Sequence, residues 1–176
     1  PTVVVVEGFR SCYRRWPALV PISMFVRSGF NVLAMDLRNH GTSDMETGYT
    51  SFGHQEHKDV LGGVDYLLET YGPEGLNFTS IAVFGTSMGA ATLLAFVKEP
   101  RLKVAVVDSP PCNVRRMLEW NADGFMGLSG KFLMGAACTV SKTLSKHGCP
   151  PFGNNPYDEV LNIGERPIMF ISTEQD

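Results

Sequence analysis

A serine at the centre of a Gly-Thr-Ser-Met-Gly segment, residues 85–89, could serve as a nucleophile. The segment matches the pattern G-x-S-x-G and lies between two apolar stretches, residues 81–84 and 88–97. A chain of this composition would contain the pattern by chance with a probability of roughly 0.1, so its position is what makes it informative. We predict a strand before Ser87, a helix after it, and the serine in the turn between them.

Such a turn presents a serine only if the backbone bends sharply at that residue. Ser87 would then be strained, and the positions two before and two after it would lie too close together for ordinary side chains. Gly85 and Gly89 satisfy this demand. The hydroxyl would stand above the carboxyl edge of a sheet, beside the helix N–H of Met88, which could stabilise an oxyanion. A Gly/Ser-rich connection without chemistry is the alternative.

The segments that must position this serine alternate between buried strands and amphipathic helices. Strands are predicted at residues 3–6, 31–35, 81–84, 104–107 and 167–172, and helices at residues 17–28, 51–71 and 88–97. We expect Pro21 to confine the first helix to the residues after it, Thr50 or Ser51 to cap the second, and Gly72 to end it. Alternation of this kind predicts an α/β fold with a parallel sheet.

Between residues 110 and 166 this alternation stops, and methionine, leucine and phenylalanine side chains stand among glycines. We interpret this part as a helical lid inserted into a core that comprises residues 1–109 and resumes at residues 167–176. Flexible thioethers suit a lid over an apolar acyl pocket, although ordinary core packing accounts for the same composition.

Composition and charge exclude several classes of function. The 176 residues, 44% hydrophobic and 19% charged, suffice for one folded domain or for a piece of a larger one. A net charge of −3 disfavours nucleic acid as a partner, and polar residues interrupt the longest uncharged stretch, residues 75–97, so no membrane span is expected. The four cysteines lack C-x-x-C spacing and His54, Glu56 and His57 lack zinc spacing, so no metal site is predicted. No signal-peptide pattern is visible, so we expect a cytoplasmic protein, and no oligomeric state is indicated.

Four segments resemble the α/β-hydrolase family in the same order along the chain. Residues 3–9 (VVVVEGF) are similar to the family's strand and His-Gly-x loop, and residues 31–43 (NVLAMDLRNHGTS) to its strand ending in D-x-R-G-H-G-x-S. The G-x-S-x-G segment follows, and residues 167–176 (PIMFISTEQD) are similar to the strand whose following loop carries an acid. The resemblance implies a mostly parallel sheet with helices on both faces and a helical lid.

The resemblance also implies a set of roles. The family's triad runs Ser, Asp or Glu, then His, which makes Ser87 the nucleophile and Asp176 the acid. The oxyanion hole would consist of the backbone N–H groups of Met88 and Phe9, with Arg10 as the nearest alternative to Phe9. These roles imply a serine hydrolase that cleaves an ester, thioester or amide of a small apolar acyl substrate through an acyl-serine, without a cofactor.

The expected base does not stand at the matching position. All four histidines, His40, His54, His57 and His147, precede Asp176, whereas the family's catalytic histidine follows the acid. We therefore expect the chain to be an inactive fragment of a longer enzyme whose histidine lies about 25–35 residues beyond Asp176. An inactive binding or scaffold protein of the same fold, or an acyltransferase that uses the same serine, is the alternative.

Other positions depart from the family pattern or qualify it. Asp108 ends a predicted strand and is the second choice for the acid, or a turn-capping residue. Glu7 stands where the family usually has histidine. Asn39 replaces a glycine, which is tolerable if that position is left-handed. We expect Asp36 and Arg38 to brace the loop that contains Asn39.

Overall fold

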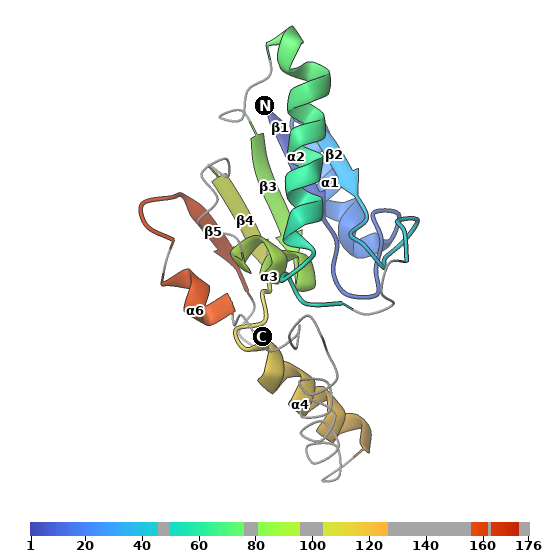
Figure 1. Cartoon of the computed structure of the whole chain (residues 1–176), viewed down its shortest axis with the longest axis vertical. Helices are drawn as coiled ribbons and strands as arrows, with labels where there is room; N and C mark the ends of the chain where they lie inside the picture. Colours follow the sequence, from blue (N-terminus) through green and yellow to red (C-terminus); the bar gives the residue numbers. More distant parts are fainter. Residues whose placement is uncertain (46–49, 76–80, 96–103, 127–155, 162, 173–176) are drawn as a thin grey trace.

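The computed structural model describes residues 1–45, 50–75, 81–95, 104–126, 156–161 and 163–172. Within these residues five strands form one sheet in the order β2-β1-β3-β4-β5, and all neighbours are parallel (Figure 1). The strands are β1 (Thr2–Val6), β2 (Asn31–Met35), β3 (Ile81–Thr86), β4 (Val104–Asp108) and β5 (Ile168–Ile171). All five predicted strands are therefore confirmed, and β3 continues through Gly85 to the serine turn.

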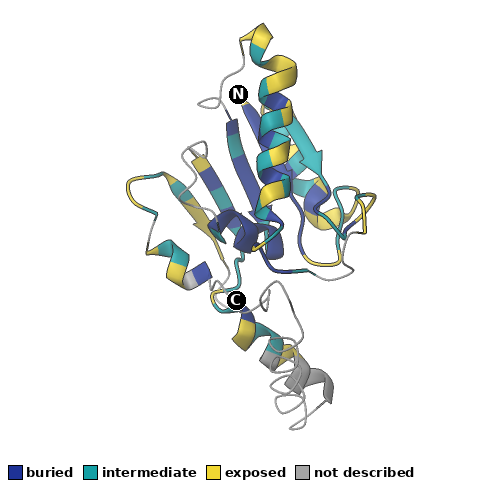
Figure 2. Ribbon diagram, viewed as in Figure 1, coloured by how far each residue is buried: buried dark blue, intermediate teal, exposed yellow. Residues whose placement is uncertain are grey.

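The valines of β1 are buried on both faces of the sheet (Figure 2). Val4 and Val6 pack in one hydrophobic cluster with residues of α2 and α3, whereas Val3 and Val5 pack in a second cluster with residues of α1. Consecutive side chains of a strand point to opposite faces, so α1 covers one face and α2 and α3 the other. The helices are α1 (Trp16–Arg27), α2 (His57–Tyr71) and α3 (Met88–Ala95).

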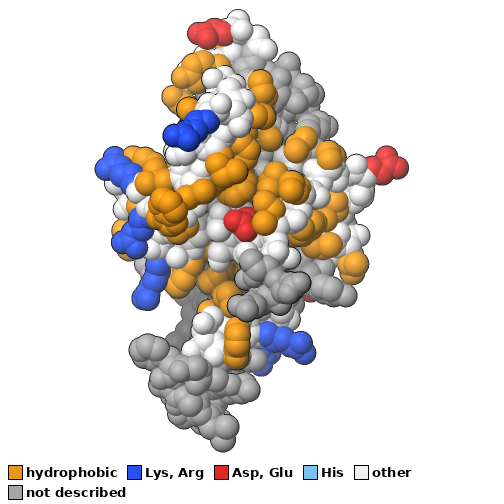
Figure 3. All heavy atoms as spheres, turned by 180° about the vertical axis from the view of Figure 1, so that it is seen from behind, with side chains coloured by type: hydrophobic (Ala, Val, Ile, Leu, Met, Phe, Trp, Pro, Cys, Tyr) orange, Lys and Arg blue, Asp and Glu red, His pale blue; other side chains and the backbone are white. Residues whose placement is uncertain are grey.

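The helix α1 begins earlier than its sequence predicts. Pro21 does not confine the helix to the residues after it, because α1 runs from Trp16 through Pro21. Pro17 suits a first turn, and Pro21 removes one backbone hydrogen bond, although Pro21 is itself buried inside the helix. The exposed apolar residues of α1 are Trp16, Leu19, Met24 and Val26. Apolar side chains also cover much of the back face of the molecule (Figure 3).

The start of α2 also differs from its prediction. Neither Thr50 nor Ser51 caps the helix, because α2 begins at His57 and has no side-chain cap. The Ser51 hydroxyl instead accepts the N–H of Gln55 at 2.7 Å, and the Glu56 carboxylate accepts the N–H groups of residues 51 and 53. The loop thus folds around Glu56 before the helix starts. As predicted, α2 ends before Gly72, where the 3-10 turn η1 (Gly72–Glu74) follows.

Beyond β4 the described chain forms α4 (Val114–Met126) and α6 (Pro156–Val160). Val114 is buried, and Met117 and Leu118 pack against the cluster shared with α2 and α3, while the rest of α4 extends away from the sheet (Figure 1). Residues 127–155, which make up most of the predicted lid, lie outside the described residues. In the described ranges no helix is both long and apolar enough to cross a membrane.

Candidate active site

Ser87 forms the turn between β3 and α3. Its φ angle is 53°, a left-handed conformation that residues other than glycine rarely adopt. The Ser87 N–H donates to the carbonyl of Asp108 at 2.8 Å, and the Ser87 carbonyl accepts the N–H of Ala91 at 2.9 Å. The strained turn predicted from the sequence is therefore present, and hydrogen bonds to β4 and α3 hold it from both sides.

Gly85 and Gly89 lie where three backbone segments approach one another. A Cβ atom on Gly85 would lie 2.6 Å from the carbonyl carbon of Gly89. A Cβ atom on Gly89 would lie 2.6 Å from the carbonyl oxygen of Glu7 and 2.7 Å from that of Val6. Both contacts involve backbone atoms, which cannot turn aside as a flexible side chain can. The expectation that ordinary side chains do not fit at these two positions is confirmed.

The loop after β1 lies directly against the serine. A Cβ atom on Gly8 would lie 3.5 Å from the Cβ of Ser87, and Phe9 is the next residue. Met88 is the first residue of α3, where a backbone N–H has no acceptor within the helix. Its side chain is buried, and the Thr50 hydroxyl lies 3.1 Å from its sulfur. The structure thus brings the loop that contains Phe9 to Ser87 and Met88, at the carboxyl ends of β1 and β3.

The two candidate acids follow neighbouring strands. Asp108 ends β4, where it pairs with Thr86 of β3 on one side and Ile171 of β5 on the other. Its carboxylate accepts the hydroxyl of Ser109 at 3.1 Å. The chain after β5 therefore leaves the sheet beside Asp108, at the same edge as the serine turn. Asp176 itself lies outside the described residues.

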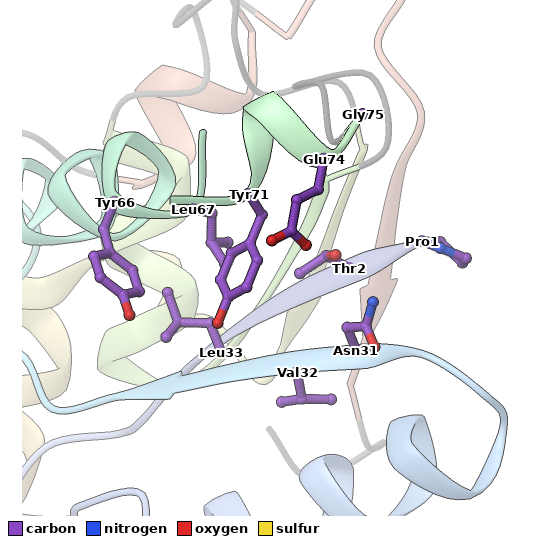
Figure 4. Close-up of a pocket in the computed structure, with 10 residues that line it drawn as sticks. All are labelled: Pro1, Thr2, Asn31, Val32, Leu33, Tyr66, Leu67, Tyr71, Glu74 and Gly75. Atoms are coloured by element: carbon purple, nitrogen blue, oxygen red, sulfur yellow. The ribbon is translucent and has the colours of Figure 1, made fainter. Parts of the chain in front are cut away.

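Among the hollows of the described residues, two lie at opposite edges of the sheet. One, of about 720 Å³, lies at the amino ends of β1 and β2 and is lined by Asn31, Leu33, Tyr66 and Tyr71 among others (Figure 4). The other, of about 610 Å³, is lined by Phe9 and its neighbours at the carboxyl edge. Ligands of parallel α/β sheets bind at the carboxyl ends of the strands, so the second hollow is the candidate substrate pocket.

Two arginines of this pocket, Arg10 and Arg15, are not predicted from the sequence as substrate-binding residues. A signal is present, since residues 10–15 contain three arginines directly after the loop that resembles an oxyanion loop. Only the fold shows that two of the three line the pocket.

Comparison with known proteins identifies the family. Residues 1–148 match the family model described as serine aminopeptidase, S33 (Hydrolase_4). The chain belongs to this family. No curated protein matches the sequence.

Solved structures confirm the fold of this Hydrolase_4 chain. The esterase Pf2001 of Pyrococcus furiosus is 26% identical with a TM-score of 0.70, and the match covers 96% of this chain and 60% of the esterase. The α/β hydrolase GrgF of Penicillium sp. sh18 is 19% identical with a TM-score of 0.62, over 99% of this chain and 71% of that one. A monoacylglycerol lipase of Paleococcus ferrophilus is 20% identical with a TM-score of 0.53, over 96% and 71%. The fold is that of the α/β hydrolases, and the chain spans about 60% of the length of Pf2001.

The described histidines of this Hydrolase_4 member contact backbone carbonyl groups or face solvent. His40 Nδ1 lies 3.0 Å from the carbonyl oxygen of Arg38, and His57 Nδ1 lies 2.9 Å from that of residue 53. His54 is exposed, and His147 lies outside the described residues. Within the described ranges no group of three or more His, Cys, Asp or Glu side chains could hold a metal ion.

Asp36 and Arg38 brace the loop after β2, as predicted. The Asp36 carboxylate accepts the N–H groups of residues 13 and 42, at 2.8 and 2.9 Å, which ties this loop to the one after β1. Arg38 pairs with Asp59 of α2, with 2.6 Å between Nη2 and Oδ1. Asn39 has a φ angle of 61°, so the left-handed position expected for a glycine replacement is confirmed.

Two buried glutamates near the site have pKa values that are shifted in opposite directions. Glu7, at the family's usual histidine position, is 1% exposed, and its Oε1 accepts the N–H of Leu37 at 2.8 Å. Among the described residues its Oε2 has no hydrogen-bond partner. Burial raises the pKa of Glu7 to about 7. Burial also acts to raise the pKa of Glu56, but hydrogen bonds from Ser51 and Gly53 outweigh it and lower that pKa.

Replacing Gly89 by alanine should destabilise the fold by about 2 kcal/mol or more, because the new methyl group would overlap backbone carbonyl oxygens of β1 and its loop. Gly62→Ala is the matched control, since a Cβ atom at this exposed position of α2 meets nothing within 4 Å. The control should stabilise the protein by about 0.5–1 kcal/mol. Urea unfolding followed by circular dichroism measures both, and equal effects would contradict the close approach at Gly89.

The pH dependence of stability should show the influence of Glu7. An acid whose pKa is higher in the folded than in the unfolded chain binds more protons when folded, so the free energy of unfolding falls as pH rises from about 4.5 to about 7. Glu7→Gln imitates the neutral acid and should remove this loss, which amounts to about 3 kcal/mol at most. Urea unfolding of both proteins at about pH 5 and about pH 8 measures it.

Glu56→Gln is the matched control, because the pKa of Glu56 is shifted in the opposite direction to that of Glu7. The lowered pKa of Glu56 stabilises the fold above the pKa of the unfolded chain, and this contribution is lost as pH falls. Glu56→Gln should therefore be more destabilising at about pH 7 than at about pH 3, because the contribution is lost only as pH falls below the unfolded pKa of 4.5. If the two substitutions changed the pH dependence in the same direction, the electrostatic difference between the two glutamates would be refuted.

Proposed function

We propose that the protein is a serine hydrolase that cleaves carboxylic esters, thioesters or amides through an acyl-Ser87 intermediate. The observation that carries the proposal is the left-handed Ser87, with a φ angle of 53°, in a strand-to-helix turn against which the loop after β1 packs. This is the arrangement that a nucleophile elbow requires. The likeness to the esterase Pf2001 supports ester substrates, and the description of the family as serine aminopeptidase is the reason to include amides.

In the proposed reaction a neutral imidazole takes the proton of Ser87 Oγ while the oxygen attacks the carbonyl carbon of the substrate. The N–H groups of Phe9 and Met88 stabilise the negative charge on the carbonyl oxygen, and the loss of one such donor typically raises the barrier by about 3 kcal/mol. The imidazolium then protonates the leaving alcohol, thiol or amine. A water molecule repeats the sequence and releases the carboxylic acid. Serine, base, acid and backbone suffice, so the proposal includes no cofactor.

We assign the acid role to Asp176 and the imidazole to a histidine that follows it in the full-length protein. The end of β5 beside Asp108 supports this assignment, because the chain that leads to Asp176 starts at the edge that carries Ser87. Asp108 has contacts typical of a structural residue. Its carbonyl accepts the Ser87 N–H, and its carboxylate accepts the Ser109 hydroxyl.

The apolar wall of the pocket favours an apolar acyl group. The rings of Phe9 and Phe52 lie 5.6 Å apart, and both line the pocket together with Leu118 of α4. Because Leu118 belongs to residues 110–166, we propose that this segment forms a lid over the acyl chain.

Labelling with a fluorophosphonate tests the nucleophile in the full-length protein. We expect covalent modification of the wild type at Ser87 and none in Ser87→Ala, because only an activated hydroxyl attacks the phosphorus. Ser109→Ala is the matched control, since Ser109 is also left-handed, with a φ angle of 50°, and follows the next strand of the sheet. It should be labelled like the wild type. An unlabelled wild type would favour the inactive binding protein, and transfer of the acyl group to an added alcohol would favour the acyltransferase.

Asp176→Asn in the full-length protein should lower kcat/KM by about 10⁴-fold without loss of folding, because the imidazole would lose the group that orients it. Asp108→Asn should lower kcat/KM by about tenfold or less. Ester hydrolysis and thermal unfolding of both variants provide the measurement. A larger effect for Asp108→Asn would transfer the acid role to Asp108.

A further inference from the structure

The pocket at the carboxyl edge, which Phe9 lines, has a basic wall. It is formed by the loops after β1 and β2, the loop before α2, and Leu118 of α4. Among the described residues that line it, Arg10 and Arg15 carry positive charge, and none is a carboxylate. The chain as a whole has a net charge of −3, so the charge of this wall is opposite in sign to the net charge of the chain. Lys and Arg side chains also gather along one flank of the back face (Figure 3).

Contacts within the loop after β1 hold both guanidinium groups at the pocket. Arg15 Nη1 donates to the carbonyl of Arg10 at 3.3 Å. The guanidinium carbon of Arg10 lies 5.6 Å from the centre of the Phe9 ring, and the backbone of Arg10 is left-handed, with a φ angle of 56°. A guanidinium has five N–H donors, and both side chains are exposed, so most of these donors remain able to bind an anion.

Two acidic side chains near the pocket, Asp36 and Asp59, have other partners. Asp36 is buried and accepts backbone N–H groups of residues 13 and 42. Asp59 forms its ion pair with Arg38. Both carboxylates line an adjoining hollow of about 450 Å³ rather than the pocket of Arg10 and Arg15.

We propose that Arg10 and Arg15 bind a negatively charged group of the substrate, a carboxylate or a phosphate, while the scissile bond lies at Ser87. This inference rests on the proposed function and names its substrate class: an ester whose acyl chain ends in an anionic group. Phe9 connects the two parts of the site, because Gly8 lies against Ser87 and the Phe9 ring contacts the Arg10 guanidinium. The apolar wall accommodates the methylene groups between the carbonyl and the anion.

Two p-nitrophenyl esters test the inference in the full-length protein. The butyrate is neutral, and the hydrogen glutarate carries a carboxylate at the end of a chain of similar length. The ratio of kcat/KM for the glutarate to that for the butyrate should fall by about tenfold in the double variant Arg10→Gln, Arg15→Gln. Added salt should lower the same ratio in the wild type, since exposed charge pairs are screened.

Arg14→Gln is the matched control. Arg14 belongs to the same loop and lies between Arg10 and Arg15 in the sequence. Its Nε donates to the Tyr13 hydroxyl at 2.7 Å, and its side chain does not line the pocket. The ratio of kcat/KM for the glutarate to that for the butyrate should be the same in Arg14→Gln as in the wild type. If Arg14→Gln lowered the ratio as far as the double variant, the effect would reflect net charge and the inference would be wrong.

Binding of the free anions gives a readout that does not need catalysis. Calorimetry of Ser87→Ala with glutarate and with inorganic phosphate should show binding that the added Arg10→Gln and Arg15→Gln substitutions abolish. Stronger binding of one anion identifies the carboxylate or the phosphate as the natural group. The inference would be refuted, and the proposed function left intact, if the protein hydrolysed the butyrate but showed no arginine-dependent preference for the glutarate and bound neither anion. Arginine-dependent anion binding without hydrolysis of either ester would refute the hydrolase and leave the anion site.

Discussion

The close approach of three backbone segments at the carboxyl edge of the sheet is the constraint on which the candidate site depends. β1 and β3 are neighbours, with Val6 paired to Gly85, and Ser87 alone separates the end of β3 from the start of α3. To pack α3 back on the sheet, the chain must reverse direction at that one residue. Gly85 and Gly89 let the backbones meet, and the reversal makes Ser87 left-handed. The place of the hydroxyl thus follows from the packing of a helix on a sheet, not from contacts of the serine side chain.

Features that arise from local pattern were predictable from the sequence. The valine run of β1 is buried on both faces, which leaves a strand of a parallel sheet as its natural conformation. The serine turn follows from glycine spacing, and the left-handed Asn39 follows from the replacement of a glycine. Local rules failed where packing or a competing hydrogen bond decided the outcome. Pro21 is a buried residue inside α1, and the loop before α2 is organised by a buried carboxylate instead of a hydroxyl cap.

Features that join distant parts of the chain were not predictable in this way. Glu7 and Leu37 are 30 residues apart in the sequence, so nothing near Glu7 indicates that its carboxyl group points to the N–H after β2. The pocket likewise combines side chains from three loops and α4. The arginines of residues 10–15 look like ordinary solvated side chains until the fold places two of them beside Phe9. The candidate acid Asp176 is a prediction from resemblance alone, because it lies outside the described residues.

The replacement of the family's histidine by Glu7 raises an electrostatic question that the structure answers. A negative charge beneath the loop that carries the Phe9 N–H would oppose the oxyanion that this N–H is proposed to stabilise. Burial favours the neutral carboxyl group and raises its pKa to about 7, and it outweighs the hydrogen bond from the Leu37 N–H, which acts to lower that pKa. On the other side of Phe9, Arg10 and Arg15 add positive charge. The loop after β1 is therefore compatible with a negative charge on the substrate. The raised pKa of Glu7 favours its neutral form, and Arg10 and Arg15 line the pocket.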